Sequence, residues 1–246
     1  MKVSWLRVYS FIGCLTDYYI ALGVNYLGQQ EFAQKRFFWC TGESLQFTEL
    51  PKSLGPTCRP LYDQIQCGFT GEFDKVIIQH NGSSQYVFAD KELLAKVRIP
   101  ERGITELDRL SHVVNQIDSD CHIVPKGSLK KTPLKETRIN EAFHGLKADE
   151  TFQIENYYHF RAPMHKHKVE LNKRSEGIYN HDFMDNASED VPNGVWSVLK
   201  DTMGQVSVIR NKLWPGFYAF HKSNSNVYGC FYMGNGVKNL DLPFMY

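Results

Sequence analysis

Two histidines one residue apart, His165 and His167, are the residues whose types and spacing most readily suggest chemistry. On a strand, side chains two positions apart point to the same face, so both imidazoles could bind one metal ion. His159 and His181 are close enough in sequence to add ligands. However, lysines interleave with the pair, and no cysteine or carboxylate stands at a recognised ligand spacing. We therefore expect no metal and no cofactor, and keep an enzyme or metal-binding protein using these four histidines as the alternative.

Recognised catalytic signatures are missing from the sequence. It contains no G-x-S-x-G elbow, no G-x-x-x-x-G-K-[ST] phosphate loop, no G-x-G-x-x-G motif and no H-E-x-x-H motif. A catalytic triad is a spatial arrangement, so sequence separation cannot test for one. The formal net charge of +1 and the lack of a nucleic-acid motif argue against a nucleic-acid partner. The sequence therefore favours a protein that is not an enzyme and does not bind nucleic acid.

The elements that would position any site are short and mixed, which predicts an α+β fold of antiparallel hairpins with a few helices. An amphipathic helix is expected over residues 106–117, because Thr105 can cap it, Asp108 completes a capping box, and apolar residues recur at helical spacing. A short strand over 121–124 and a second helix over 149–158 should follow. We expect one domain over 1–246, with subdomains of about 1–104 and 105–246 as a possible division.

Hairpins dominate the expected structure of the first hundred residues. One pairs 37–40 with 45–48 around a turn at 41–44, and another pairs 75–79 with 85–88 around Asn81-Gly82. Residues 51–60 form a loop, and 90–97 form one or two helical turns. The chain should open with a strand and a short helix that ends at Gly23.

The last 34 residues are rich in aromatic side chains and turn signals. Trp214-Pro215-Gly216 predicts a turn, and 217–220 and 227–234 predict a hairpin followed by an extended apolar tail. Both faces of this hairpin are apolar, so it is either the centre of the chain's own core or a surface that a partner covers. The expected interaction residues are Trp214, Phe217, Tyr218, Tyr228, Phe231, Tyr232, Leu240, Leu242, Pro243 and Phe244.

Two charged runs precede this ending. Residues 161–174 are basic, and residues 182–190 carry four acids. Such runs are usually solvated loop faces, and the functional alternative is a docking surface with a basic half and an acidic half.

The compartment is indicated by the cysteines and by the apolar runs. Six cysteines are scattered without a C-x-x-C pair, which suits reduced thiols in the cytosol and predicts no disulfide. The opening apolar run is too short for a signal peptide of the usual form, and no segment reaches the roughly 20 apolar residues of a transmembrane helix. No membrane partner is expected.

Several stretches together resemble one family. They are Asp17-Tyr18-Tyr19-Ile20-Ala21, Phe143-x-Gly145-Leu146, Tyr158-His159-Phe160-Arg161, Trp214-Pro215-Gly216, the middle segment 123–133 and the ending 238–245. Their order and spacing are similar to the radial spoke head protein 9 homologues of motile cilia. Members usually carry a largely helical extension ahead of the part matching residues 5–23, and this chain is expected to lack it.

The resemblance implies a non-enzymatic structural subunit of the radial spoke head, in the axoneme of cilia and flagella and hence in the cytoskeleton of the cytoplasm. Implied partners are spoke-head proteins four and six, other spoke-head subunits and, transiently, central-pair projections. Through these contacts the head passes signals to the dyneins that control ciliary motility.

Overall fold

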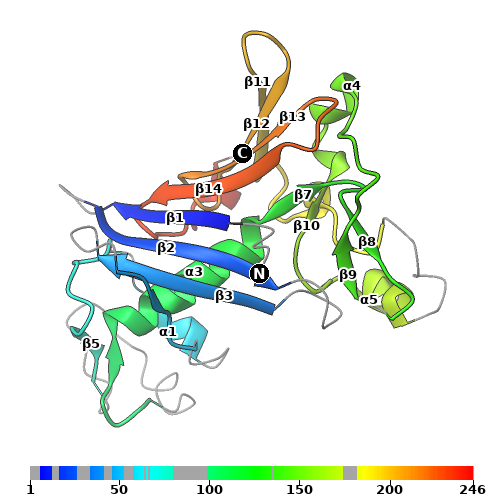
Figure 1. Cartoon of the computed structure of the whole chain (residues 1–246). Coiled ribbons are helices and arrows are strands. Elements are labelled where there is room, and N and C mark those ends of the chain that lie inside the picture. Colours follow the sequence, from blue (N-terminus) through cyan, green and yellow to red (C-terminus); the bar gives the residue numbers. More distant parts are fainter. Residues whose placement is uncertain are drawn as a thin grey trace.

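The structure, a computed structural model, describes residues 6–12, 17–26, 34–41, 46–52, 58–63, 65, 67–79, 99–134, 136–173 and 182–245, with side chains from residue 35 onward. Its main element is an eight-stranded sheet, formed in spatial order by β11 (Trp196–Lys200), β12 (Val206–Asn211), β13 (Phe217–Lys222), β14 (Tyr228–Gly234), β1 (Leu6–Ile12), β2 (Asp17–Tyr26), β3 (Gln34–Thr41) and β4 (Thr48–Glu49). Neighbouring strands are antiparallel except β1 and β14, which are parallel. The sheet therefore joins the two ends of the chain (Figure 1).

One long helix, α3 (Glu106–Cys121), packs on a single face of this sheet. It begins where the sequence predicts, because Thr105 and Asp108 form a capping box. The Asp108 N–H donates to Thr105 Oγ1 at 3.3 Å, and the Thr105 N–H donates to Asp108 Oδ2 at 3.0 Å. The helix runs four residues beyond the predicted end at Ile117 and stops before the strand that follows.

The main core lies between α3 and the inner face of the sheet. Alternation along the strands places the inward side chains, as β13 shows with Phe217 and Ala219 buried while Tyr218 and Phe220 are half-buried on the other face. The buried side chains that meet here include Leu110, Val114 and Ile117 of α3, Ile209 of β12, Phe217 and Ala219 of β13, Tyr232 of β14, and Phe37 and Trp39 of β3. Figure 1 shows α3 crossing behind β2 and β3.

Shorter elements flank this core on both sides. Near the start of α3 lie α1 (Arg59–Asp63), β5 (Val76–Ile78) and β6 (Ile104–Thr105), which share a second apolar cluster. After α3 come β7 (Ile123–Pro125), β8 (Leu129–Lys131), β9 (Thr137–Ile139), α4 (Ala148–Thr151), the 3-10 turn η2 (Ile154–Asn156), β10 (Tyr157–His159), α5 (Lys166–Lys173) and η4 (Ala187–Glu189), and the tail holds η5 (Leu242–Phe244). The predicted α+β class is confirmed.

Two predicted helices are wrong. The segment expected to end as a helix at Gly23 is strand β2, whose backbone pairs with β1 on one side and β3 on the other. The helix expected over 149–158 is one turn of α4, then η2, and then β10, which pairs with β7. Tyr157 and Tyr158 are both buried, so tertiary packing overrides the weak helical pattern there.

The predicted hairpins have mixed outcomes. The C-terminal hairpin is confirmed as β13 and β14, and the predicted strand at 121–124 is β7, which begins at Ile123. The strand predicted at 45–48 is β4, two residues long, and it pairs with β3 as expected. Strand β5, the first strand of the predicted hairpin at 75–79 and 85–88, pairs with β6, and Val76 lies opposite Thr105. Its predicted partner 85–88 and the turns at 90–97 lie outside the described residues. So does the middle of the predicted loop 51–60, residues 53–57, and the last two residues of that loop begin α1.

Three sequence expectations can be placed on this fold. The large sheet takes strands from both sides of residue 104, so it crosses the possible subdomain boundary. Cysteines 40, 58, 67, 121 and 230 are free thiols, and Cys14 lies outside the described residues. No helix in the described part of the chain is both long and apolar enough to span a bilayer.

Gly216 gives a test of this architecture. Its φ is +100°, and an added Cβ would lie 2.1 Å from the Met233 carbonyl oxygen across the sheet. We expect Gly216→Ala to lower the free energy of unfolding by at least about 2 kcal/mol, measured by urea denaturation. Gly204→Ala is the matched control, because Gly204 has a φ of +67° but open space around its Cβ position. Equal losses in the two variants would contradict the close approach at Gly216.

Candidate functional site

The two charged runs of the sequence fold against each other around one buried carboxylate, Asp185. Its Oδ2 accepts hydrogen bonds from Arg161 Nη1 at 2.5 Å and from the Met164 N–H at 2.8 Å, and its Oδ1 accepts from the His165 N–H at 3.2 Å. Burial alone would raise the pKa of Asp185, but these hydrogen bonds and the Arg161 charge outweigh it and hold the pKa below its usual value. Asp185 therefore fixes the chain just before α5.

Two further pairs hold the acidic run, one from Lys168 in the basic run and one from His159, which precedes that run. Lys168 Nζ lies 2.8 Å from Asp182 Oδ1 and also donates to the Asp182 carbonyl oxygen at 3.0 Å. The side chain of His159 is buried, and its Nε2 lies 2.9 Å from both carboxylate oxygens of Asp190. Asp190 also accepts from the Trp196 indole N–H at 2.7 Å. The runs are therefore only partly solvated: Arg161 and Lys168 pair with acids of the second run, while Lys166 and Lys173 are exposed. Their interpretation as a two-signed docking surface stays a prediction.

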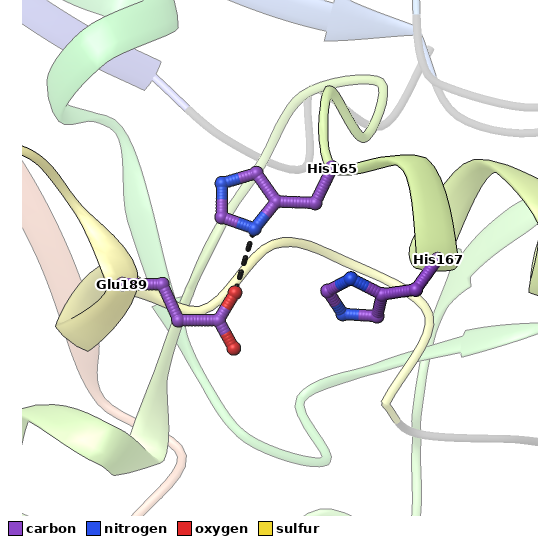
Figure 2. A group of neighbouring side chains, drawn as sticks. All are labelled: His165, His167 and Glu189. Atoms are coloured by element: carbon purple, nitrogen blue, oxygen red, sulfur yellow. Dashed lines mark hydrogen bonds and ion pairs between the residues drawn. The ribbon is translucent and has the colours of Figure 1, made fainter.

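The four histidines named by the sequence have different environments where the structure describes them. His159 is held by Asp190, and His181 lies outside the described residues. His165 and His167 stand at the start of α5, where His167 is exposed and the ring centroids are 5.8 Å apart. They meet a residue that sequence reasoning missed: Glu189 of η4, whose Oε2 lies 2.6 Å from His165 Nδ1 (Figure 2). Glu189 is 24 residues from His165, so no ligand spacing could have paired them.

A polar pocket of about 280 Å³ adjoins this group. Its wall includes His159, Arg161, His165, Glu189 and Asp190, with Asp120 and Lys238 also contributing. The described residues that line it include no serine, threonine or cysteine that could act as a nucleophile. Its ionisable side chains pair with one another, His159 with Asp190, His165 with Glu189 and Lys238 with Asp120.

The expected interaction residues of the C-terminal segment divide into two groups. Trp214, Phe217, Tyr232 and Leu242 are at most 2% exposed, so a partner cannot contact them and their predicted role is corrected to that of core residues. Trp214 also donates its indole N–H to Asp120 Oδ2 of α3 at 3.0 Å. The turn at Trp214-Pro215-Gly216 therefore anchors the chain inward.

The remaining predicted residues lie nearer the surface. Tyr228 is half-buried and packs edge-on against Phe143 and His221, which places it on the inner side of β14. Tyr218 and Phe231 stack on the outer face of the sheet, with centroids 5.4 Å apart. In the tail, Leu240, Pro243 and Phe244 are exposed, and Phe244 keeps 86% of its accessible surface.

The outer face of the sheet contains further apolar side chains that the sequence did not single out. We define the outer apolar face as Val208, Tyr218, Phe220, Phe231 and Met233, which alternate with the core residues of β12, β13 and β14. Arg210, Tyr218 and Phe231 lie opposite one another across the three strands, and so do Val208, Phe220 and Gly229. Phe231 is 41% exposed and Met233 is 54% exposed. The strand period could have identified these residues once the inner face was known.

Taken together, the fold and the site define a mixed α+β protein that pairs many of its charges internally and exposes apolar side chains on one sheet face. No protein-family model matches the chain. It is 32% identical over 248 residues to Radial spoke head protein 9 homolog of Homo sapiens, a match that covers 98% of this chain and 83% of the human protein. The homologues of Bos taurus (31% over 248 residues, 98% and 83% covered) and Danio rerio (32% over 238 residues, 95% and 82% covered) are similar. The chain belongs to the radial spoke head protein 9 family.

Neutralising Asp185 tests the internal pairing of the charged runs. We expect Asp185→Asn to lower the free energy of unfolding by about 3 kcal/mol at pH 7, because the Arg161 guanidinium would remain largely buried without its counter-charge. The pKa of Asp185 is depressed on folding, so its contribution is present at neutral pH and lost as the pH falls through the folded value, below 3.8. The difference between wild type and variant should therefore shrink in acid.

The matched control for this measurement is Glu49→Gln, which removes the acid of an exposed ion pair with Arg36. Exposed pairs contribute little, so chemical denaturation should detect almost no change. If Asp185→Asn were as mild as this control at pH 7, the central role of Asp185 would be wrong.

Proposed function

We propose that this chain is a non-enzymatic structural subunit of the radial spoke head in motile cilia and flagella. Support comes from its family, whose members are named for the spoke head. The single observation that carries the binding role is the outer apolar face, which leaves large side chains in water. We further propose that it lies in the axoneme, away from membrane and nucleic acid.

One residue of the outer apolar face, Tyr218, also lines a pocket that the tail shares. A pocket of about 510 Å³ is lined by Arg210 and Tyr218 on the sheet and by Asn239, Leu242 and Met245 in the tail. Tail residues Phe244 and Met245 are themselves exposed beside it. A partner side chain entering this pocket would bury apolar surface of the sheet and of the tail together, which favours binding.

The charged runs are a weaker candidate for the same contact. Asp185 and Lys168 are buried, the Arg161 side chain is largely covered, and all three are already paired within the chain, so they offer a partner little unsatisfied charge. Water around exposed apolar side chains is released when a partner covers them, and this drives most protein association. The outer apolar face is therefore the better contact surface.

The partners proposed for this face are the homologues of radial spoke head proteins four and six, together with other spoke-head subunits. Transient contacts of the assembled head with central-pair projections would pass a mechanical signal towards the dyneins and so shape the ciliary beat. In this account the chain contributes a rigid binding surface, because α3 and the sheet are held by one continuous core.

Fractionation of cilia tests the subunit role. We expect the chain to remain with detergent-stripped axonemes and to co-purify with spoke-head proteins four and six. Recovery only in the soluble membrane-plus-matrix fraction would contradict the proposal.

A charge placed on the outer apolar face should separate binding from folding. We expect Phe231→Glu to fold normally but to weaken binding to spoke-head proteins four and six by at least about tenfold, because a charge would be buried in an apolar contact. Leu134→Glu is the matched control, since Leu134 is 79% exposed in the turn between β8 and β9. Affinities measured by biolayer interferometry that are equal for both variants would exclude this face.

Two apolar side chains of the tail, Leu242 and Phe244, allow folding and binding to be separated because one is buried and the other exposed. Leu242→Ala should lower the free energy of unfolding by about 2 to 5 kcal/mol, since Leu242 is buried. Phe244→Ala should change folding stability by less than about 0.5 kcal/mol and instead weaken partner binding. Urea denaturation and affinity measurements on both variants check this, and unchanged affinity in Phe244→Ala would remove the tail from the interface.

A further inference from the structure

Three potential metal ligands from two separate elements converge beside the polar pocket. His165 and His167 come from the start of α5, and Glu189 comes from η4 (Figure 2). One nitrogen of each imidazole and one carboxylate oxygen all lie within 4.8 Å of one another. His165 Nδ1 and Glu189 Oε2 are already 2.6 Å apart. The group therefore needs only small side-chain movements to surround an ion.

The backbone under these three side chains is held independently of any ion. Asp185 binds the backbone N–H groups of Met164 and His165, which fixes the start of α5. One residue further on, Asn186 caps η4 by accepting the Ser188 N–H at 2.8 Å, which fixes the turn carrying Glu189. A ligand set on elements fixed in this way loses little conformational entropy on binding.

The donor set selects the kind of ion. Two imidazole nitrogens and one carboxylate oxygen suit zinc and similar first-row divalent ions, whereas calcium and magnesium prefer all-oxygen sites. Around tetrahedral zinc, with bonds of about 2.0 to 2.1 Å, ligand atoms lie roughly 3.4 Å apart. His167 and Glu189 are exposed and His165 is half-buried, so rotation about their side-chain bonds can close the remaining distance.

Nearby positive charge does not oppose an ion here as strongly as the sequence suggests. The lysines that interleave with the histidines are one of the reasons the sequence gives to expect no metal, but Lys168 pairs with Asp182 and Arg161 pairs with Asp185. Lys166 is exposed to solvent, where water and salt screen its charge. The cations nearest the backbone of the site are therefore largely neutralised by their own partners.

We propose that His165, His167 and Glu189 bind one zinc-class divalent ion, with a fourth coordination position left to water or to a partner side chain. The ion would replace the His165–Glu189 hydrogen bond and tie α5 to η4. It would thus brace the two charged runs from the solvent side, opposite the buried contacts of Asp185. This site shares no residue with the outer apolar face, so zinc binding can be tested independently of binding to spoke-head partners.

Zinc titration of the full-length, untagged chain tests the site. We expect isothermal titration with ZnCl₂ to give one zinc per chain, and CoCl₂ to give the intense visible absorption of four-coordinate cobalt. His165→Gln, His167→Gln and Glu189→Gln should each weaken zinc binding by at least about tenfold, because each removes one of three protein ligands. Zinc should also raise the melting temperature of the wild type but not of the triple variant.

His144→Gln is the matched control, because His144 is also exposed but belongs to none of these elements. It should bind zinc as the wild type does, and circular dichroism should show all variants folded. Zinc binding that survives in the triple variant, or that is weakened equally by His144→Gln, would overturn the site. So would the absence of binding to the wild type, which would leave His165 and Glu189 as a plain surface ion pair.

Discussion

Helix α3 covers one face of the large sheet, and this single contact determines which side chains form the core and which face outward. A sheet has two faces, and α3 buries the inward side chains of β3, β12, β13 and β14 in one core. Because side chains alternate along each strand, the same residues that make this core oblige their neighbours to point outward. Phe231 and Met233 are therefore exposed as a direct consequence of Tyr232 being buried.

The charged runs differ from the apolar strands, because many of their polar side chains are paired within the chain and not left exposed. Their side chains are used to fasten the chain to itself, since Asp185 gathers Arg161 and two backbone N–H groups while Lys168 binds Asp182. Several charges that the sequence offers to a partner, such as Arg161 and Lys168, therefore form ion pairs within the chain. The surface that remains for recognition is the outer apolar face with the adjoining tail, and a small cluster of two histidines and a glutamate within the charged runs.

Sequence reasoning succeeded where local chemistry decides the structure. Thr105 and Asp108 specify the start of α3 by themselves, and the C-terminal hairpin follows from a strand-turn-strand pattern. It failed where distant residues decide. Residues 17–26 become a strand because β1 and β3 lie on either side, and a short apolar run does not reveal that. Similarly, Trp214 packs in the main core and donates its indole N–H to Asp120, which lies 94 positions earlier in the sequence. No local pattern reveals this contact.

Hydroxyl-radical footprinting of the chain, alone and within assembled spoke heads, tests the central claim most directly, because it reports the solvent access of individual side chains. We expect oxidation of Tyr218, Phe231 and Met233 to fall strongly on assembly, while Met164, an exposed residue of the basic run, keeps its reactivity. Protection of Met164 with unchanged oxidation of Phe231 and Met233 would contradict it, and would move the interface to the charged runs.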